Sequence, residues 1–216
     1  LKDKNKIIEF SNGNVKSFLH IEIYNDLKEE IIDFLNNYHQ KYSLRPGFPK
    51  EEFRKTVSVN LNKKEFDQLI STLKNNNKIK IKGSKVALNN FEIKFNSKQK
   101  EIKNNIIDIF KNNFMPPTAD EIPAKFDDQD QASEVFQALV NEGLIKKIDH
   151  KLYFHKDTVD KAEKLLINYL KDNKSIELSE FRDLLESSRK YTLPLLEYFD
   201  QKNYLKRKGD KRILDK

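Results

Sequence analysis

The chain has 216 residues, which is enough for one large domain or for two to four small ones. Charged residues make up 35% and hydrophobic residues 37%, a balance that suits small domains better than one large core. Lys and Arg outnumber Asp and Glu by 41 to 34, which favours an anionic partner such as nucleic acid. The absence of cysteine excludes disulfides, a cysteine nucleophile and cysteine-based zinc sites.

No segment is suited to crossing or entering a membrane. No run approaches the ~18 consecutive apolar residues that a spanning helix needs, and the first four residues lack the apolar core of a signal peptide. The sequence therefore predicts no membrane partner and a cytoplasmic location. Because it begins at Leu1 without an initiator Met, we interpret it as a piece of a longer protein.

The predicted elements follow one order three times, after an N-terminal hairpin. Residues 1–23 alternate as strand, turn and strand, and are either the end of an earlier domain or a linker. A long amphipathic helix, a short helix, a third helix and a two-stranded hairpin then recur in residues 24–96, 97–155 and 156–216. This order is the plan of the winged helix, a helix-turn-helix with a β wing.

The repeated hairpin is the clearest internal signal. Residues 78–88, 144–154 and 204–214 each alternate apolar and polar residues, turn at the centre, and alternate again. We therefore predict a mainly α fold with small β hairpins, an α+β class, built as tandem winged-helix domains in an extended arrangement.

Two local features carry expectations of their own. A start signal at residues 118–121 predicts a short helix in the middle domain. Pro194 lies inside the third helix of the last domain, and since proline lacks a backbone donor we expect a kink there or a displaced helix start.

The sequence contains no recognisable catalytic or metal-binding motif. Only five glycines occur, and no glycine-rich phosphate loop or nucleophile motif is present, so we expect no enzyme and no cofactor in this chain. His150 and His155 are expected at a solvated wing turn rather than as metal ligands. The acidic run at residues 127–130 is interpreted as a helix N-terminus rather than a divalent-metal site.

Positive charge is concentrated near the C-terminus. Residues 189–216 carry 9 basic and 4 acidic residues, whereas residues 97–155 carry 8 basic and 10 acidic ones. In a winged helix, the start of the third helix and the wing can face a nucleic acid together, and a helix N-terminus adds donors for phosphate. The candidate nucleic-acid-binding residues are Arg189 and Lys190 after Ser188, with Lys206, Arg207, Lys208, Lys211 and Arg212 on the wing.

Two further candidates have a competing structural interpretation. Tyr191 could stack on a base, but its spacing to Leu195 fits a core position better. The first domain carries lysines on its own wing, which we interpret as an ordinary solvated hairpin face because lysine is the default surface residue of this chain: Lys78, Lys80, Lys82 and Lys85.

Two stretches resemble bacterial selenocysteine-specific elongation factors (SelB). Residues 188–200, with Phe181–Leu185 before them and residues 207–212 after them, resemble the last winged helix of that family. Residues 38–54 are similar to an earlier winged helix in it, and Pro194 belongs to the family pattern.

The resemblance implies a function that the residues alone do not give. The full protein would carry an N-terminal GTP-binding part, with GTP and Mg, that delivers selenocysteinyl-tRNA to the ribosome. Its C-terminal arm would hold four winged helices, the last of which binds a messenger-RNA hairpin, the selenocysteine insertion sequence (SECIS), beside a UGA codon. The RNA loop would then be bound by the helix-turn-helix residues Arg182, Ser188, Arg189, Lys190 and Tyr191, and the stem phosphates by the wing.

Two other classes of function remain open. A tandem winged-helix DNA-binding regulator would place the third helix in a major groove, although Pro194 and the modest charge argue mildly against it. A protein-interaction scaffold would bind no nucleic acid, and the acidic middle domain fits that alternative. We expect a monomer, because no repeated apolar face is left uncovered.

Overall fold

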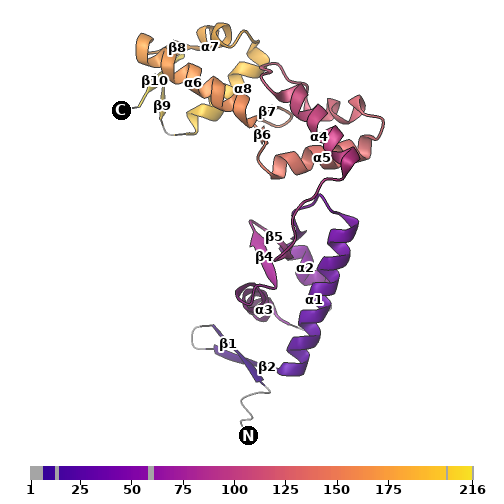
Figure 1. Ribbon diagram of the computed structural model, residues 1–216. Helices are drawn as coiled ribbons and strands as arrows, with labels where there is room; N and C mark the ends of the chain where they lie inside the picture. Colours follow the sequence, from indigo (N-terminus) through magenta and orange to yellow (C-terminus); the bar gives the residue numbers. More distant parts are fainter. Residues whose placement is uncertain (1–6, 13–14, 58–60, 203, 216) are drawn as a thin grey trace. The chain divides into compact units, whose positions relative to one another are not determined.

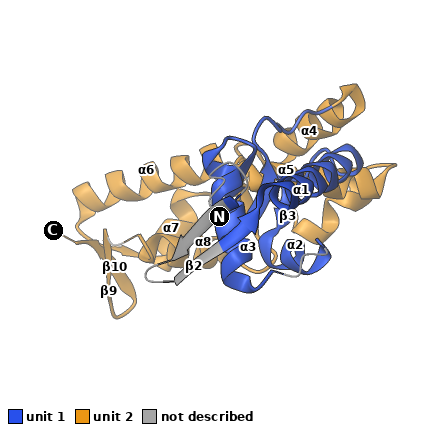
Figure 2. Cartoon of the chain, turned by 90° about the horizontal axis from the view of Figure 1, so that it is seen from below, with its two compact units in different colours: residues 1–95 blue, residues 96–216 orange. Residues whose placement is uncertain are grey.

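The computed structural model describes residues 7–12, 15–57, 61–202 and 204–215 (Figure 1). The chain forms two compact units, residues 1–95 and residues 96–216, coloured separately in Figure 2. Helices joined to small antiparallel sheets make up both units, which confirms the predicted mainly α class with β hairpins. Among the described residues, no helix is long and apolar enough to span a bilayer.

Unit 1 opens with the hairpin that the alternation predicts. β1 (Ile7–Asn12) and β2 (Val15–His20) pair antiparallel, and the centre of the predicted turn lies outside the described residues. β2 runs directly into α1 (Ile21–Lys41), where the side chain of His20 accepts a hydrogen bond from the Glu22 amide. The helix thus begins three residues before the predicted boundary at residue 24, because this histidine supplies an N-cap that the apolar periodicity does not reveal.

The rest of unit 1 is a winged helix with a three-stranded sheet. β3 is a two-residue strand that sequence alternation could not reveal, and it pairs with the second wing strand to give the order β3-β5-β4. The elements are β3 (Phe48–Pro49), α2 (Lys50–Thr56), α3 (Lys63–Asn75), β4 (Ile79–Lys82) and β5 (Lys85–Leu88).

The core of unit 1 fixes the third helix against the wing. Phe53, Phe66, Leu69 and Val86 are buried together, so the apolar stripe of α3 meets both α2 and β5. Gly47 has φ +155°, and a Cβ there would lie 2.5 Å from the Val86 carbonyl oxygen. Only glycine therefore lets the chain approach β5 closely enough for β3 to pair with it.

The first half of unit 2 keeps the same order with a shortened second helix. Two 3₁₀ turns stand where the sequence predicts one short helix, and Pro123 opens the second of them. Asp128 caps the next helix by accepting from the Gln131 amide and also pairs with Lys98, so the acidic run serves a helix N-terminus. The elements are α4 (Ser97–Phe110), η1 (Ala119–Glu121), η2 (Pro123–Lys125), α5 (Gln129–Asn141), β6 (Ile145–Lys147) and β7 (Tyr153–His155).

The second half of unit 2 repeats the complete winged helix of unit 1. Its strand order β8-β10-β9 matches β3-β5-β4, again with a two-residue strand before the second helix. α8 begins at Arg189, so Pro194 lies inside the helix without displacing its start. The elements are α6 (Lys156–Asn173), β8 (Ile176–Glu177), α7 (Leu178–Leu184), α8 (Arg189–Asp200), β9 (Leu205–Lys208) and β10 (Lys211–Leu214).

The expectation of a solvated turn holds for His150, which is exposed, but is wrong for His155. The latter is 4% exposed and is the N-cap of α6, where Nδ1 accepts from the Asp157 amide. The reason is that β7 continues straight into α6, so its last residue lies at a buried junction rather than at the tip of the wing.

Candidate nucleic-acid interface

The helix-turn-helix of the last domain presents the start of α8 to solvent. Ser188 is the N-cap residue, and its side chain makes no capping hydrogen bond. Arg189 and Lys190 follow as exposed residues in a first turn that contains no acid. The helix end therefore offers backbone N–H groups and two cations together, an arrangement suited to an anionic ligand.

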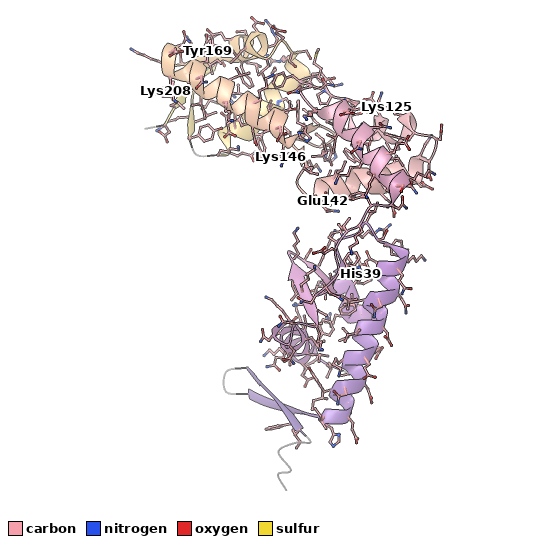
Figure 3. All side chains as sticks on the ribbon, in the orientation of Figure 1. His39, Lys125, Glu142, Lys146, Tyr169 and Lys208 are labelled. Carbon is pink, nitrogen blue, oxygen red and sulfur yellow. The ribbon has the colours of Figure 1, made fainter. Side chains whose placement is uncertain are left out.

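The wing supplies four more exposed cations, three of them with a contact inside the domain. Lys206 lies 4.0 Å from Asp215, and Lys211 lies 3.3 Å from Glu177. Arg207 donates from Nε to the Gly209 carbonyl at 3.0 Å, which orients its side chain along the wing turn. Lys208, labelled in Figure 3, makes no ion pair within the described part of the chain.

Arg212 differs from the other wing candidates. It is 3% exposed, and its guanidinium pairs with Asp200 at the end of α8, with Nη2 to Oδ2 at 3.0 Å. A buried arginine in such a pair has little free surface for a ligand. The structure places it as a link between β10 of the wing and the end of α8.

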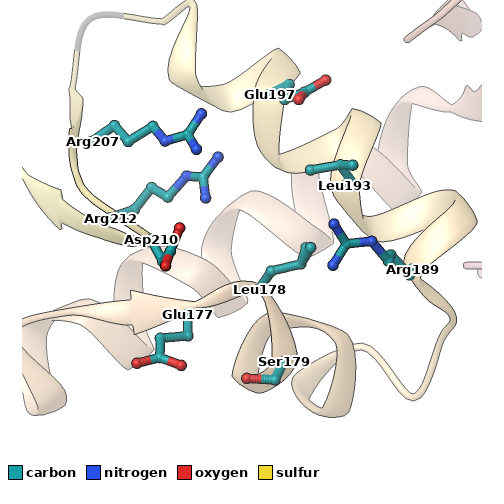
Figure 4. A pocket seen from close by; sticks show the side chains of 9 residues that line it. All are labelled: Glu177, Leu178, Ser179, Arg189, Leu193, Glu197, Arg207, Asp210 and Arg212. Carbon is teal, nitrogen blue, oxygen red and sulfur yellow. The ribbon is translucent and has the colours of Figure 1, made fainter.

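A hollow of about 430 Å³ lies between the start of α8 and the wing. Figure 4 shows the guanidinium groups of Arg189 and Arg207 directed into it from opposite sides. Leu178 and Leu193 give it an apolar surface. Its volume falls in the range of ~300–1,000 Å³ that ligand pockets occupy. Three carboxylates also line it, from Glu177, Glu197 and Asp210.

The two remaining candidates lie away from this hollow. Tyr191 is half-buried and packs against the core of the last domain, as its spacing to Leu195 indicates. It also faces the residues after α4. Arg182 is exposed on α7 and forms a two-nitrogen contact with Asp183 at 2.7 and 2.9 Å. The hollow thus brings together Arg189 and Arg207 but neither of these residues.

The elements around the hollow are held by side chains far from it in sequence. The Glu177 amide and the Tyr169 hydroxyl donate to Glu180, and these bonds keep the pKa of that carboxyl below its usual range. Glu163 of α6 accepts from Lys202 and Tyr204 just before β9, and burial with this bond raises the pKa of Tyr204. Strand β8 beside the wing and the chain entering β9 are therefore each tied to a helix.

The described residues contain no group of three or more His, Asp or Glu side chains that could hold a metal ion.

The sequence analysis identified the basic residues on either side of the hollow but missed the other residues that line it. Leu178, Ser179 and Leu193 give no signal in the sequence, because their periodicity is that of ordinary helix residues.

Comparison with known proteins connects this geometry to a family. Residues 32–88 match the model of the second winged helix of elongation factor SelB, and residues 168–214 match the model of the third. Two segments of the chain therefore resemble winged-helix domains of SelB. The matched segments lie one in each unit, and each runs from inside the first helix of a winged helix, α1 or α6, to its last strand.

Individual SelB proteins and structures are also similar to this chain. The chain is 23% identical over 208 residues to the selenocysteine-specific elongation factor of Desulfomicrobium baculatum, covering 93% of this chain and 32% of the relative. It is similar in fold to the crystal structure of a bacterial EF-Sec, with TM-score 0.58 and 21% identity over 96% of this chain and 32% of that one. The mRNA-binding domain of Escherichia coli SelB, solved with SECIS RNA, matches over 56% of this chain and 100% of that one, with 21% identity and TM-score 0.47. The chain spans about a third of the length of the curated SelB relatives.

Proposed function

We propose that this chain is the RNA-binding C-terminal part of a selenocysteine-specific elongation factor and recognises the SECIS hairpin of a messenger RNA. The family matches support the factor class. The observation that carries RNA recognition is the hollow between α8 and the wing, with Arg189 and Arg207 on opposite sides of it.

The chemistry of the hollow suits an unstacked base. An A-form stem hides its base edges from side chains, so a protein reads bases that protrude from loops. Leu178 and Leu193 can contact the faces of such a base, while a guanidinium can stack on it or donate to its edge. The carboxylate of Asp210, which also lines the hollow, can accept from an exocyclic amino group. Outside the hollow, Lys206, Lys208 and Lys211 would hold stem phosphates.

A titration tests this proposal directly. The protein is titrated with a labelled SECIS-type hairpin, with the same hairpin mutated in its loop, and with a DNA duplex of equal length, at two salt concentrations. We expect tight binding to the intact hairpin alone, and lower affinity at higher salt because phosphate contacts release counterions. Equal weak binding to all three nucleic acids would contradict base recognition.

Substitutions assign the contacts. Arg189→Ala should weaken binding to the intact hairpin by ~1–3 kcal/mol and reduce discrimination against the mutated loop. Lys206→Ala should weaken both hairpins similarly. Lys164, exposed on α6 and outside the lining of the hollow, gives the control variant Lys164→Ala, whose affinity should match the wild type. Unchanged discrimination by Arg189→Ala would remove that residue from the site.

The parts beyond this chain complete the proposal. The whole protein would bind GTP and Mg in a separate N-terminal part, carry selenocysteinyl-tRNA to the ribosome, and act in the cytoplasm. The present chain would contribute no catalysis and would act as a monomer. β1 and β2 would be the wing of a preceding winged helix, since β2 enters α1 through a histidine cap as β7 enters α6.

A further inference from the structure

The two complete winged helices carry the same four cationic positions. In the last domain these are the first two residues of α8, Arg189 and Lys190, and the two residues that flank the wing turn. In unit 1 the first two residues of α3 and the two residues flanking its wing turn are also cations: Lys63, Lys64, Lys82 and Lys85. All of these lysines are exposed except Lys85, which is partly exposed.

In both domains these charges oppose the local electrostatics of the fold. Lys82 lies directly across from Lys85, as Lys208 does from Lys211, and like charges opposite each other destabilise a hairpin. Cations at the start of a helix are also unfavourable to its dipole. In the last domain Glu177 lies 3.3 Å from Lys211 and relieves part of this repulsion. Within the described residues Lys82 and Lys85 have no acidic partner, and Pro49 stands opposite Lys85 on the third strand.

The middle domain shows that the fold does not require this arrangement. Its α5 begins with Gln129 and Asp130, so no cation occupies its first two positions, whereas α3 of unit 1 has Lys63 and Lys64 there before Glu65. Its wing pairs Lys147 with Tyr153, and Lys151 is neutralised by Asp120 at 2.5 Å. An anion bound across wing and helix would relieve the repulsion in the two outer domains, whereas the middle domain has none to relieve.

The residues that line the hollow of the last domain are replaced in unit 1 by residues of different chemistry. The first residue of α7 and the fifth residue of α8, Leu178 and Leu193, give the last domain its apolar surface. The same places in unit 1 are Lys50 and Asp67, which form an ion pair with Nζ to Oδ1 at 2.7 Å. This ion pair is polar where the last domain is apolar, and Ile81 occupies the strand position that Arg207 has in the last domain.

We propose that the wing of unit 1 and the start of α3 form a second RNA surface, which holds the phosphate backbone of double-helical RNA without reading bases. Unit 1 also carries most of the net charge, with 18 basic against 12 acidic residues in residues 1–95 and 23 against 22 in residues 96–216. Lys80 contributes less, because its Nζ contacts the Phe91 carbonyl. This surface does not depend on base recognition by the last domain.

The test uses the whole chain and a blunt 20-base-pair RNA duplex, which has no loop or bulge. Lys82→Gln/Lys85→Gln should bind this duplex about tenfold more weakly, with a salt slope smaller by about two, since each lysine is expected to neutralise one phosphate. Its ratio of affinities for intact and loop-mutated hairpins should equal that of the wild type. Lys74→Gln/Lys94→Gln removes the same charge from exposed positions away from the wing turn and should change duplex affinity far less. Circular dichroism melting checks that all variants are folded.

Three results would overturn the proposal: duplex affinity unchanged in Lys82→Gln/Lys85→Gln, an equal loss in Lys74→Gln/Lys94→Gln, or competition by polyglutamate as strong as that of duplex RNA at equal charge. The last result would indicate an acidic protein partner instead. If the protein bound the intact and the loop-mutated hairpin equally, the proposed function would be contradicted, but the duplex result would be unaffected. The failure of one proposal can therefore be distinguished from the failure of the other.

Discussion

At the scale of single residues, burial decides what a cation can do. Arg189 and Arg212 both lie in the basic C-terminal segment, and both line the hollow. Arg189 is exposed at the start of a helix, whereas Arg212 is 3% exposed and paired with Asp200. The first is available to a ligand, and the second stabilises the fold that presents it.

Burial also sets the acid sensitivity of unit 1 through His39. This side chain is 6% exposed, stacks on Phe91 with centroids 3.5 Å apart, and accepts at Nε2 from the Leu88 amide. Burial, reinforced by the charge of Lys80, lowers the pKa of His39 to about 4. An unfolded histidine has a pKa near ~6.5.

The stability of unit 1 should therefore fall as pH drops from about 6.5 to about 4. In this window the unfolded state binds a proton at His39 that the folded state does not, so acid favours unfolding. At pH 4.5 the loss attributable to His39 should be about 2.5 kcal/mol relative to pH 7. Denaturant unfolding of the wild type and His39→Gln at both pH values gives the free energy of unfolding of each. The contribution of His39 is the difference between the losses that the two proteins show from pH 7 to pH 4.5.

A matched substitution separates this effect from general acid denaturation. His150 is exposed in the other unit, so His150→Gln should retain the acid sensitivity of unit 1. Equal pH dependence of the wild type and His39→Gln would show that His39 is not the responsible group.

At the scale of elements, the last wing is held by its two ends. Lys202 and Tyr204 bond to Glu163 just before β9, and Arg212 of β10 pairs with Asp200 at the end of α8. These contacts fix the distance between wing and helix, and therefore the width of the hollow. A change in either contact should alter RNA binding through geometry rather than through a lost RNA contact.

Asp200→Ala should destabilise unit 2 by about 3 kcal/mol, because it leaves the guanidinium of Arg212 buried without its partner. The double variant Asp200→Ala/Arg212→Met should recover most of this loss, since it removes the buried charge as well. Denaturant unfolding measures both. A loss below about 0.5 kcal/mol for Asp200→Ala would place the pair among exposed ion pairs of little energetic weight.

At the scale of the whole molecule, hydrogen bonds join the two halves of unit 2. Thr158 of α6 is fully buried, accepts from the Asn112 amide at 3.0 Å and donates to the Phe110 carbonyl at 3.3 Å. Ser187, in the turn before α8, donates to the Phe114 carbonyl at 2.8 Å. The helix-turn-helix of the last domain is thereby fixed to the middle domain.

Thr158→Val should lower the melting temperature of unit 2 by several degrees, because the Asn112 amide loses its acceptor at a cost of ~1–3 kcal/mol. Calorimetry should show the middle and last domains unfolding in one transition, with the transition of unit 1 unchanged. Thr72→Val removes a hydroxyl that donates to the Gln68 carbonyl in unit 1, and should shift only the transition of that unit. Separate melting of the middle and last domains in the wild type would contradict this coupling.

The sequence by itself determined the repeat. Alternation around three central turns and three sets of apolar helix positions suffice to predict winged helices, because hydrophobic periodicity reflects which faces are buried. The predicted start of the last third helix at Arg189 agrees with the structure, and α4 and α6 begin at the predicted boundaries, residues 97 and 156. The prediction of a short α-helix in the middle domain was wrong. Its start signal at residues 118–121 opens a 3₁₀ turn, and a second 3₁₀ turn begins at Pro123.

Only the tertiary structure decided which cations are available and where a ligand could enter. Nothing in the order of residues distinguishes Arg207, directed into the hollow, from Arg212, buried against Asp200. Likewise, the last domain has Leu178 and Leu193 where unit 1 has the ion pair of Lys50 and Asp67. Only the packing of the two helices shows that these residues lie side by side. Periodicity encodes burial along one element, whereas a site depends on distances between elements that packing alone sets.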